Sequence, residues 1–326
     1  MAVVTTGFFD GVHLGHRHVL ETVVSSARER GEEAVVITFW PHPRAVLQQD
    51  ARDFRLLTSL EEKKALLMAA GIDRVEVIPF TRKFAAMKAD EYLNLLQSRY
   101  NASLIVMGYD NRIGSDRKTA EEMCVCQTVG SADPSHLRWA PPSYMAEGGH
   151  GFDTHTSLPP VAILKPVIPG LTDCHSERSE ESPISSTRIR KALEAGEIEK
   201  ANAMLGYEYG LHGVVVAGNR LGRTIGFPTA NMQLYEPLKL VPLNGVYAVQ
   251  VEVTGGVFRG MCNIGTRPTV GGTARTIETH ILDFDEDIYG LPLKVRFIRR
   301  IREERKFPSL EALRAQLVQD ALICKK

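Results

Sequence analysis

The sequence has no excess of either charge and no long hydrophobic run. Lys and Arg together number 39, and Asp and Glu also number 39, so the net charge is zero. Nucleic-acid-binding proteins usually carry a basic excess, and we therefore expect no nucleic-acid partner. No apolar run approaches the roughly 18 residues of a membrane span, and the N-terminus lacks a basic segment followed by an apolar one. We therefore expect no membrane association.

Cysteine is also scarce, with five residues scattered at positions 124, 126, 174, 262 and 324. The odd number and irregular spacing are typical of a reducing compartment and predict a cytoplasmic protein. Cys124 and Cys126 lie near His136, His150 and His155, but this spacing matches no zinc pattern. We favour an ordinary loop over a metal site there.

The first half of the chain alternates short apolar segments with segments of helical periodicity. This alternation predicts a parallel, doubly wound α/β sheet, in which ligands bind beyond the carboxyl ends of the strands. Segments 7–16, 41–43 and 108–117 fall at such ends. The first and third contain glycine, and the second is Pro-His-Pro. The expected strands are 2–5, 34–39, 74–80 and 103–107, and the expected helices are 18–30, 59–70 and 89–100.

The second half consists of short β-rich segments separated by Gly, Pro and Asn, which predicts an antiparallel β-barrel. The expected strands are 212–217, 245–253, 260–264, 276–284 and 293–298, followed by an amphipathic helix over 309–322. The 326 residues suffice for two domains, each with its own core. We place the first over residues 1–183, with an irregular insertion at about 120–160, then a helical segment over 184–206, and the second domain over 207–326.

A glycine-rich turn, Gly-Phe-Phe-Asp-Gly-Val-His-Leu-Gly-His, occupies residues 7–16 after the first expected strand. His13 and His16 lie three residues apart at the start of a helix, so both imidazoles can face one ligand. The helix N-terminus favours an anion, and the imidazoles would stabilise charge that develops on a phosphate. For an isolated His-x-x-His pair, solvent-facing histidines at a capped helix start are the structural alternative.

A second polar region joins a glycine-rich segment over 218–223 to Gly-Phe-Pro-Thr-Ala-Asn over 226–231. A Mg²⁺ ion carried by nucleotide phosphates needs few protein ligands, and the oxygens of Thr229 and Asn231 suffice for it. Glu278 lies in an expected strand, where alternation places it on one face with His280. Glutamate is depleted in strands, which points to a task for Glu278, whereas without the surrounding motifs a surface strand carboxylate would be favoured.

Residues 7–16 resemble the signature of the nucleotidyltransferase superfamily, which attacks the α-phosphate of ATP and releases pyrophosphate, and residues 186–190 are similar to its second signature. The resemblance implies catalytic roles for His13 and His16, and places Pro43, within Pro-His-Pro, at the flavin in a flavin-specific branch. The residues implied in ATP binding are Gly7, Phe8, Asp10, Gly11, His13, His16, Asp110, Ser186, Thr187 and Arg190. The segment 111–119 departs from the aromatic-rich loop of that branch.

Residues 218–231 closely resemble the phosphate loop of riboflavin kinase, and the segments 263–269 and 301–307 are similar to two further segments of that family. The resemblance implies that Glu278 accepts the proton of the riboflavin 5′-hydroxyl and that Arg302 contacts the isoalloxazine ring. The residues implied in ATP binding are Gly218, Gly222, Arg223, Thr229 and Asn231, of which Thr229 and Asn231 also hold Mg²⁺.

Taken together, the motifs resemble the family of bifunctional riboflavin kinase/FMN adenylyltransferases. The resemblance implies small-molecule partners only: riboflavin is phosphorylated to FMN by ATP and Mg²⁺, and FMN is then adenylated to FAD. Two alternatives stay open. One is a riboflavin kinase with an impaired first domain, motivated by the segment 111–119, and the other is a flavin-binding protein without activity. The oligomeric state is open too, a homo-oligomer included.

Overall fold

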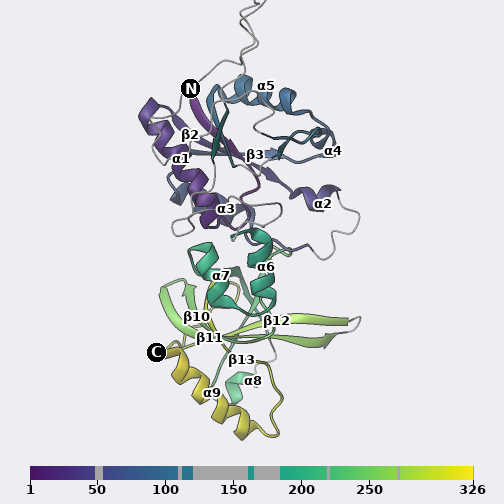
Figure 1. The fold of residues 1–326 in the computed structure, drawn as a ribbon. Helices are drawn as coiled ribbons and strands as arrows, with labels where there is room; N and C mark the ends of the chain where they lie inside the picture. The colour runs from purple at the N-terminus through teal and green to yellow at the C-terminus, as the bar shows by residue number, and fades with distance from the viewer. Residues whose placement is uncertain are drawn as a thin grey trace, which may run out of the picture. The chain divides into compact units, whose positions relative to one another are not determined.

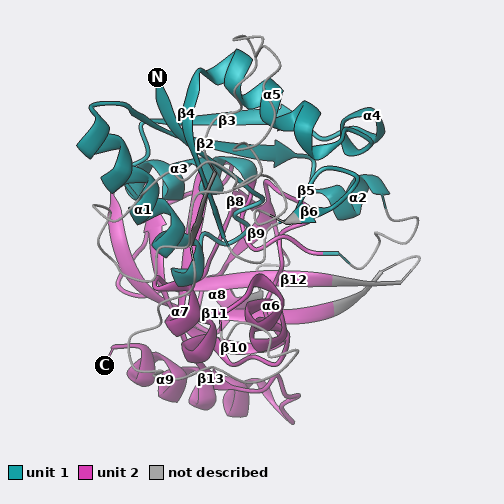
Figure 2. Cartoon of the chain, turned by 45° about the horizontal axis from the view of Figure 1, so that its top comes forward, with its two compact units in different colours: residues 1–54, 60–181 teal, residues 55–59, 182–326 magenta. Residues whose placement is uncertain are grey.

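The computed structural model describes residues 1–47, 54–108, 112–119, 161–164, 184–218, 221–269 and 272–325. The chain divides into two compact units (Figures 1 and 2). Unit 1 comprises Met1–Phe54 and Leu60–Glu181, and unit 2 comprises Arg55–Ser59 and Ser182–Lys326. Asp110 and the expected insertion over 120–160 lie outside the described residues, as do Cys124, Cys126 and the three nearby histidines.

Unit 1 contains a parallel sheet of five strands in the order β3-β2-β1-β4-β7, which confirms the expected α/β class. The strands are β1 (Ala2–Thr6), β2 (Glu33–Trp40), β3 (Arg74–Pro79), β4 (Ala102–Gly108) and β7 (Val161–Leu164). The central strand β1 pairs with both β2 and β4, and all five of its residues are buried. The sequence pattern had not predicted β7.

Helices cover this sheet, and a separate apolar cluster lies on each of its faces. One cluster includes Leu20, Val23 and Leu67, and the other includes Leu93 and Leu96. The helices are α1 (Leu14–Arg30), α2 (Pro43–Leu47), α3 (Leu60–Ala69), α4 (Arg82–Ala85) and α5 (Ala89–Tyr100), and β5 (Arg112–Ile113) pairs with β6 (Lys118–Thr119). The expected start of α1 at residue 18 was wrong, because the helix begins at Leu14.

Unit 2 is built on a closed barrel of six antiparallel strands in the order β10-β11-β12-β9-β8-β13, as expected. The strands are β8 (Gly210–Val216), β9 (Ala230–Leu234), β10 (Gly245–Val253), β11 (Gly256–Thr269), β12 (Gly272–Ile281) and β13 (Pro292–Arg302). The sequence pattern had missed β9, whose residues Asn231 and Gln233 disguise a strand that hydrogen-bonds to both β8 and β12.

Helices α6 (Ser186–Glu194) and α7 (Ile198–Leu205) belong to the core of unit 2. Ile189 and Leu193 of α6 lie in the same apolar cluster as Tyr209 and the barrel residue Phe297. The unit also contains α8 (Leu221–Thr224) and the long C-terminal α9 (Leu310–Lys325). None of the helices in the described part of the chain is long and apolar enough to cross a membrane.

We expect Tyr209→Phe to lower the free energy of unfolding of unit 2 by about 1–2 kcal/mol. The Tyr209 side chain is fully buried, and its hydroxyl donates a hydrogen bond of 2.7 Å to the carbonyl of Leu240. Phenylalanine would leave that buried carbonyl without this donor. Urea denaturation followed by tyrosine fluorescence and circular dichroism measures the change. Tyr235→Phe, at an exposed position, is the control, and equal stability of the two variants would contradict the expectation.

Candidate active sites

The first candidate site lies where the chain leaves the carboxyl end of β1. Phe9, Gly11 and Val12 all have positive φ angles, of 49°, 84° and 38°, and this run produces a tight turn before α1. The N–H of Gly7 donates to the carbonyl of Ile37 on β2, which ties the turn to the sheet. The turn buries the side chain of Asp10 at the edge of the sheet where parallel strands bind ligands.

His13 and His16 form a stacked pair at the start of α1. Their ring centroids are 3.6 Å apart with an interplanar angle of 14°. Nδ1 of His13 accepts a hydrogen bond from the backbone N–H of His16, so His13 caps the helix, and this cap explains why α1 begins earlier than the apolar pattern predicted. The two imidazoles therefore lie together at one helix N-terminus, as the sequence predicted.

Burial sets the protonation state of His16. It lowers the pKa of this imidazole well below the ordinary histidine value of 6.5, and the neighbouring charges of His13 and Lys63 lower the pKa further. Within the described part of the chain, the buried Nδ1 of His16 has no hydrogen-bond partner. His16 is therefore neutral near pH 7, and it can offer a hydrogen bond to a phosphate oxygen without carrying a charge of its own.

Aromatic side chains pack against His42, the residue before Pro43, which is the first residue of α2. The ring of Phe8 lies 4.3 Å from that of His42, which in turn lies 4.3 Å from the ring of Phe54. The Phe8 ring also packs against Phe39, at 5.5 Å. The sequence pattern pointed to Pro43 and grouped Phe8 with the ATP contacts, but it did not indicate Phe54, which is separated from the motif by a polar segment.

Ser186, Thr187 and Arg190 lie on α6, in unit 2, whereas His13 and His16 lie in unit 1. Ser185 caps α6 by accepting a hydrogen bond of 3.3 Å from the N–H of Arg188. Nε of Arg190 donates to the carbonyl of Arg55 at 2.8 Å. The predicted joint role of these residues with the two histidines stays a prediction.

The second candidate site is organised by the pairing of β12 with its neighbours. Glu278 lies opposite Asn231 on β9 and opposite Asn263 on β11. Oγ1 of Thr229, just before β9, donates a weak hydrogen bond of 3.5 Å to Oε2 of Glu278. Strands distant in sequence thus bring one carboxylate, one hydroxyl and two amides to a single point.

Glycine allows the preceding loop to approach this point closely. A Cβ atom on Gly218 would collide with the side-chain amide of Asn231, and one on Gly222 would collide with the carbonyl of Phe227. The carbonyl of Gly222 also accepts a hydrogen bond of 2.8 Å from the N–H of Phe227, which closes the turn. Arg223 follows on the short helix α8. The predicted phosphate-binding glycines are therefore positions where a side chain does not fit.

A cavity of about 780 Å³, which we call the flavin-sized cavity, opens beside Glu278. Its walls combine an apolar surface with a few polar groups, the pattern typical of small-molecule sites. The polar wall includes Glu278, His280, Asn231 and Asn263, and the apolar wall includes Phe227, Val246, Met261, Phe307, Leu313 and Leu317. Nδ1 of His280 lies 2.7 Å from the carbonyl of Pro228, so His280 holds the residue that precedes Thr229.

Arg302 lines the same cavity but is committed to an ion pair. Its Nε and Nη2 atoms donate to Oδ2 of Asp320 at 3.0 and 2.7 Å. The Asp320 side chain is fully buried on α9 and also accepts a hydrogen bond of 2.7 Å from Gln316. The contact joins α9 to the end of β13. Separating the two side chains would leave an uncompensated buried charge, so α9 is held firmly in this position.

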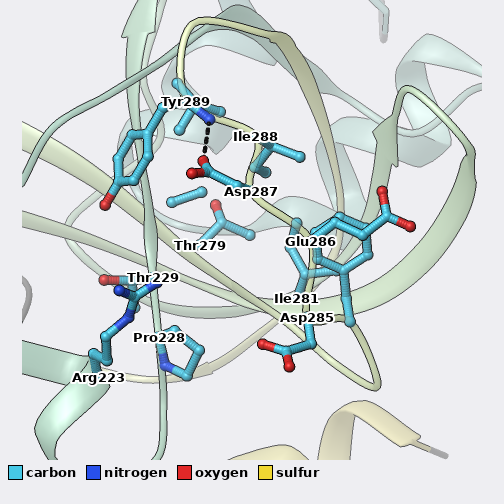
Figure 3. A pocket seen from close by; sticks show the side chains of 13 residues that line it. Arg223, Pro228, Thr229, Thr279, Ile281, Asp285, Glu286, Asp287, Ile288 and Tyr289 are labelled. Carbon is cyan, nitrogen blue, oxygen red and sulfur yellow. Dashed lines mark hydrogen bonds between the residues drawn. The ribbon is translucent and has the colours of Figure 1, made fainter.

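A smaller cavity of about 190 Å³, which we call the acidic cavity, lies on the other side of β12. Arg223 and Thr229 lie on one side of it and Asp285 and Glu286 on the other (Figure 3). The N–H of Tyr289 donates to Oδ1 of Asp287 at 3.1 Å and closes the acidic turn. The sequence patterns considered above did not indicate this segment, although three successive acidic residues between two strands are a usable signal.

Thr229 lines both cavities, and successive residues of β12 divide between them. Glu278 and His280 face the flavin-sized cavity, whereas Thr279 and Ile281 face the acidic cavity. This division is the alternation of the two faces that the sequence predicted for the strand. Groups bound in the two cavities would therefore come together at Thr229, next to Glu278.

The donor atoms at this point suit a hard cation. The hydroxyl of Thr229, the side-chain oxygen of Asn231 and the carboxylate of Glu278 are all oxygen ligands of the type that Mg²⁺ prefers. Within the described residues, no group of three or more His, Cys, Asp and Glu side chains is placed to hold a metal by itself. An ion bound here would therefore keep most of its ligands from water and from a substrate.

Two families of known proteins match the chain, one over each half. Residues 1–132 match the family described as FAD synthetase, and residues 205–326 match the family described as riboflavin kinase. The bifunctional riboflavin kinase/FMN adenylyltransferase of Bacillus subtilis is 34% identical over 322 residues, which cover 98% of this chain and 90% of that protein. The protein of the same description from Escherichia coli K12 is 34% identical over 326 residues, covering 99% and 92%.

A solved structure also matches along the whole chain. It is described as a macrolide-efflux protein from Streptococcus pneumoniae, and it is 32% identical with a TM-score of 0.81. The match covers 100% of this chain and 94% of that one.

We expect His16 to stay neutral at pH values where an ordinary histidine, with a pKa of about 6.5, is protonated. The unfolded chain takes up this proton and the native chain does not, so stability is fully present above about pH 6.5 and declines as the pH falls below it. Histidine NMR spectra recorded from pH 5 to 8, with the His16→Gln spectrum for assignment, measure the midpoint. A midpoint at or above the ordinary value would contradict the burial argument.

Proposed function

The chain belongs to the family of bifunctional riboflavin kinase/FMN adenylyltransferases, and we propose that each unit carries one of the two reactions. The chain is an enzyme of flavin-nucleotide formation that uses ATP. Unit 2 phosphorylates riboflavin to FMN and releases ADP. Unit 1 joins FMN to the adenylyl group of a second ATP, which gives FAD and pyrophosphate.

The position of Thr229 between the two cavities, with its hydroxyl hydrogen-bonded to Glu278 in the flavin-sized cavity, supports the kinase assignment to unit 2. The flavin-sized cavity has the volume and apolar wall for the isoalloxazine ring, and the acidic cavity takes the nucleoside part of ATP. The riboflavin 5′-hydroxyl then reaches Glu278, which accepts its proton. The hydroxyl oxygen bonds to the γ-phosphorus as the bond to the β-phosphate oxygen breaks.

Thr229 and Asn231 are the residues that would hold Mg²⁺ during this step, through the hydroxyl and the amide oxygen. When bound, the ion would neutralise charge on the ATP phosphate oxygens. Gly218 and Gly222 would bring their backbone N–H groups close to the same phosphates. Arg223 lines the acidic cavity. These residues therefore position the donor, while Glu278 activates the acceptor.

The stacked histidines support the adenylyltransferase assignment to unit 1. His13 and His16, at the N-terminus of α1, would contact the α-phosphate of ATP. A phosphate oxygen of FMN attacks the α-phosphorus, and the bond to the bridging oxygen of pyrophosphate breaks. The imidazoles and the helix N-terminus stabilise the charge that spreads over the phosphate oxygens.

The remaining predicted contacts complete this site as part of the proposal. Gly7 and Gly11 allow the backbone of the turn to approach the nucleotide, and Asp10 lies buried in the same turn. Pro43 would lie at the flavin, whereas the role of Ser186, Thr187 and Arg190 of α6 at the β- and γ-phosphates stays what the resemblance implies.

The kinase-only alternative rested on the divergent segment 111–119. The match to the FAD synthetase family extends over residues 1–132 and therefore includes this segment. The direct test of both activities is chromatography of the products formed from riboflavin, ATP and Mg²⁺, with a parallel reaction that starts from FMN. FAD in both reactions supports the proposal. FMN without FAD would overturn the assignment to unit 1, and no product would overturn both.

We expect Glu278→Ala to lower the rate of FMN formation by about 10²-fold or more, because the 5′-hydroxyl loses its base. FAD formation from supplied FMN should stay unchanged, since that reaction uses unit 1. Glu252→Ala is the matched control, because Glu252 is an exposed strand carboxylate outside both cavities. Equal loss of both activities in Glu278→Ala would refute separate sites.

We expect the reverse pattern for His13, whose imidazole serves only adenylyl transfer. His13→Ala should reduce FAD formation by about 10²-fold and leave riboflavin phosphorylation intact. His13→Asn separates the two roles of this residue, because asparagine can still cap α1 but offers no imidazole. Unimpaired FAD synthesis by a folded His13→Asn variant, measured beside His18→Ala as the control, would remove His13 from the site.

A further inference from the structure

Lys63 is a lysine in an unusual place. It lies on α3, and only 4% of its surface is exposed, whereas the side chain of the next residue, Lys64, is 38% exposed. Burying an ammonium group costs free energy unless the group is hydrogen-bonded or paired. A lysine with this degree of burial beside a phosphate-binding turn therefore needs an explanation.

Three hydrogen bonds join Lys63, Thr38 and the turn that follows β1. Nζ of Lys63 donates to the carbonyl of Phe8 at 3.1 Å and to Oγ1 of Thr38 at 3.0 Å. Thr38, which is buried on β2, donates its hydroxyl hydrogen to the same Phe8 carbonyl at 3.3 Å. Helix α3, strand β2 and the turn are thus joined at one carbonyl oxygen.

The carbonyl of Phe8 is a sensitive point of the turn. The next residue, Phe9, has a φ angle of 49°, and the chain reverses there toward Asp10 and His13. Rotation of the peptide that joins Phe8 and Phe9 would change the direction of everything that follows up to α1. A hydrogen bond from a charged donor is about twice as strong as one between neutral groups, so the ammonium is well suited to hold this peptide.

The charge of Lys63 also acts on the titratable groups of the turn. Burial lowers the pKa of Lys63 to about 8, and the nearby carboxylate of Asp10 opposes that change. The ammonium in turn contributes to the low pKa of His16. Three titratable groups of the turn and of α1 are therefore linked electrostatically. Lys63 interacts with Asp10 and with His16, and His16 also interacts with His13.

We propose that Lys63 is a positioning residue for adenylyl transfer: its buried ammonium holds the Phe8 carbonyl against Thr38 and so aims the turn that carries Asp10, His13 and His16. This inference rests on the proposed function of unit 1. Lys63 acts through the turn rather than on the reacting atoms. A displacement of about 1 Å at such a site can cost about 10²-fold in rate, which sets the scale of the expected effect.

The test compares Lys63→Met with Lys64→Met in the full-length chain. Methionine keeps the apolar stem of the side chain and removes the ammonium. For Lys63→Met we expect kcat for FAD formation from FMN to fall by about 10²-fold, while KM for ATP changes by less than about 3-fold. Riboflavin phosphorylation, an internal control in the other unit, should keep its wild-type rate. Lys64→Met should retain both activities.

A second readout distinguishes positioning and charge from a loss of stability. The pKa of His16, measured by histidine NMR, should rise in Lys63→Met, because a positive neighbour has been removed. If Lys63→Met does not fold, Thr38→Val tests the same link. It removes one acceptor of the ammonium, and we expect a smaller but measurable fall in the kcat of FAD formation, with phosphorylation retained.

The outcomes separate this inference from the proposed function. Wild-type chain that forms no FAD would overturn both. Wild-type chain that forms FAD, beside a folded Lys63→Met variant with the same kcat and an unchanged His16 midpoint, would overturn the role of Lys63 alone. A lower melting temperature of Lys63→Met with unchanged kcat would also overturn it, and so would an unaffected Thr38→Val variant if Lys63→Met does not fold.

Discussion

The register of β12 between β9 and β11 is the constraint on which the proposed kinase site depends. It places Glu278 opposite Asn231 on one side and Asn263 on the other. Because side chains alternate along a strand, a slip of one residue would turn Glu278 away from the flavin-sized cavity and bring Thr279 in its place. Only two pairs join β12 to β9, so closure of the barrel by the other five junctions maintains this register.

In unit 1 the side chains of the candidate site are oriented by a turn instead of by strand register. In a parallel sheet the strands end at one edge, and a turn rather than a register has to aim the functional groups. The turn after β1 buries Asp10 and His13, and buried polar groups are tolerated only where they find partners. The cap on α1 gives His13 such a partner, and Lys63 donates to the carbonyl of Phe8 in the same turn. The polar interactions that stabilise the turn therefore also orient the groups proposed to bind phosphate.

Sequence patterns predicted the features that follow from periodicity and from motifs. They missed the features that arise only from contacts with elements distant in the sequence. Alternation correctly divided Glu278 and Thr279 between two faces, and the order of the fold classes along the chain was right. By contrast, β9 was missed because its polar residues become strand-like only when β8 and β12 pair with it. Lys63 was missed because a lysine on a helix ordinarily faces water, and its acceptors lie on two other elements.

The ion pair between Arg302 and Asp320 shows how a predicted ligand contact can also be a structural joint. The guanidinium lines the flavin-sized cavity, yet its Nε and Nη2 atoms are both held by the buried carboxylate. Leu313 and Leu317, on the same helix as Asp320, form part of the apolar wall. A change in the position of Arg302 would therefore move α9 and the wall with it. One interaction thus sets both the direction of the guanidinium and the position of the helix that carries the apolar wall, so the proposed flavin contact would depend on the joined pair rather than on Arg302 alone.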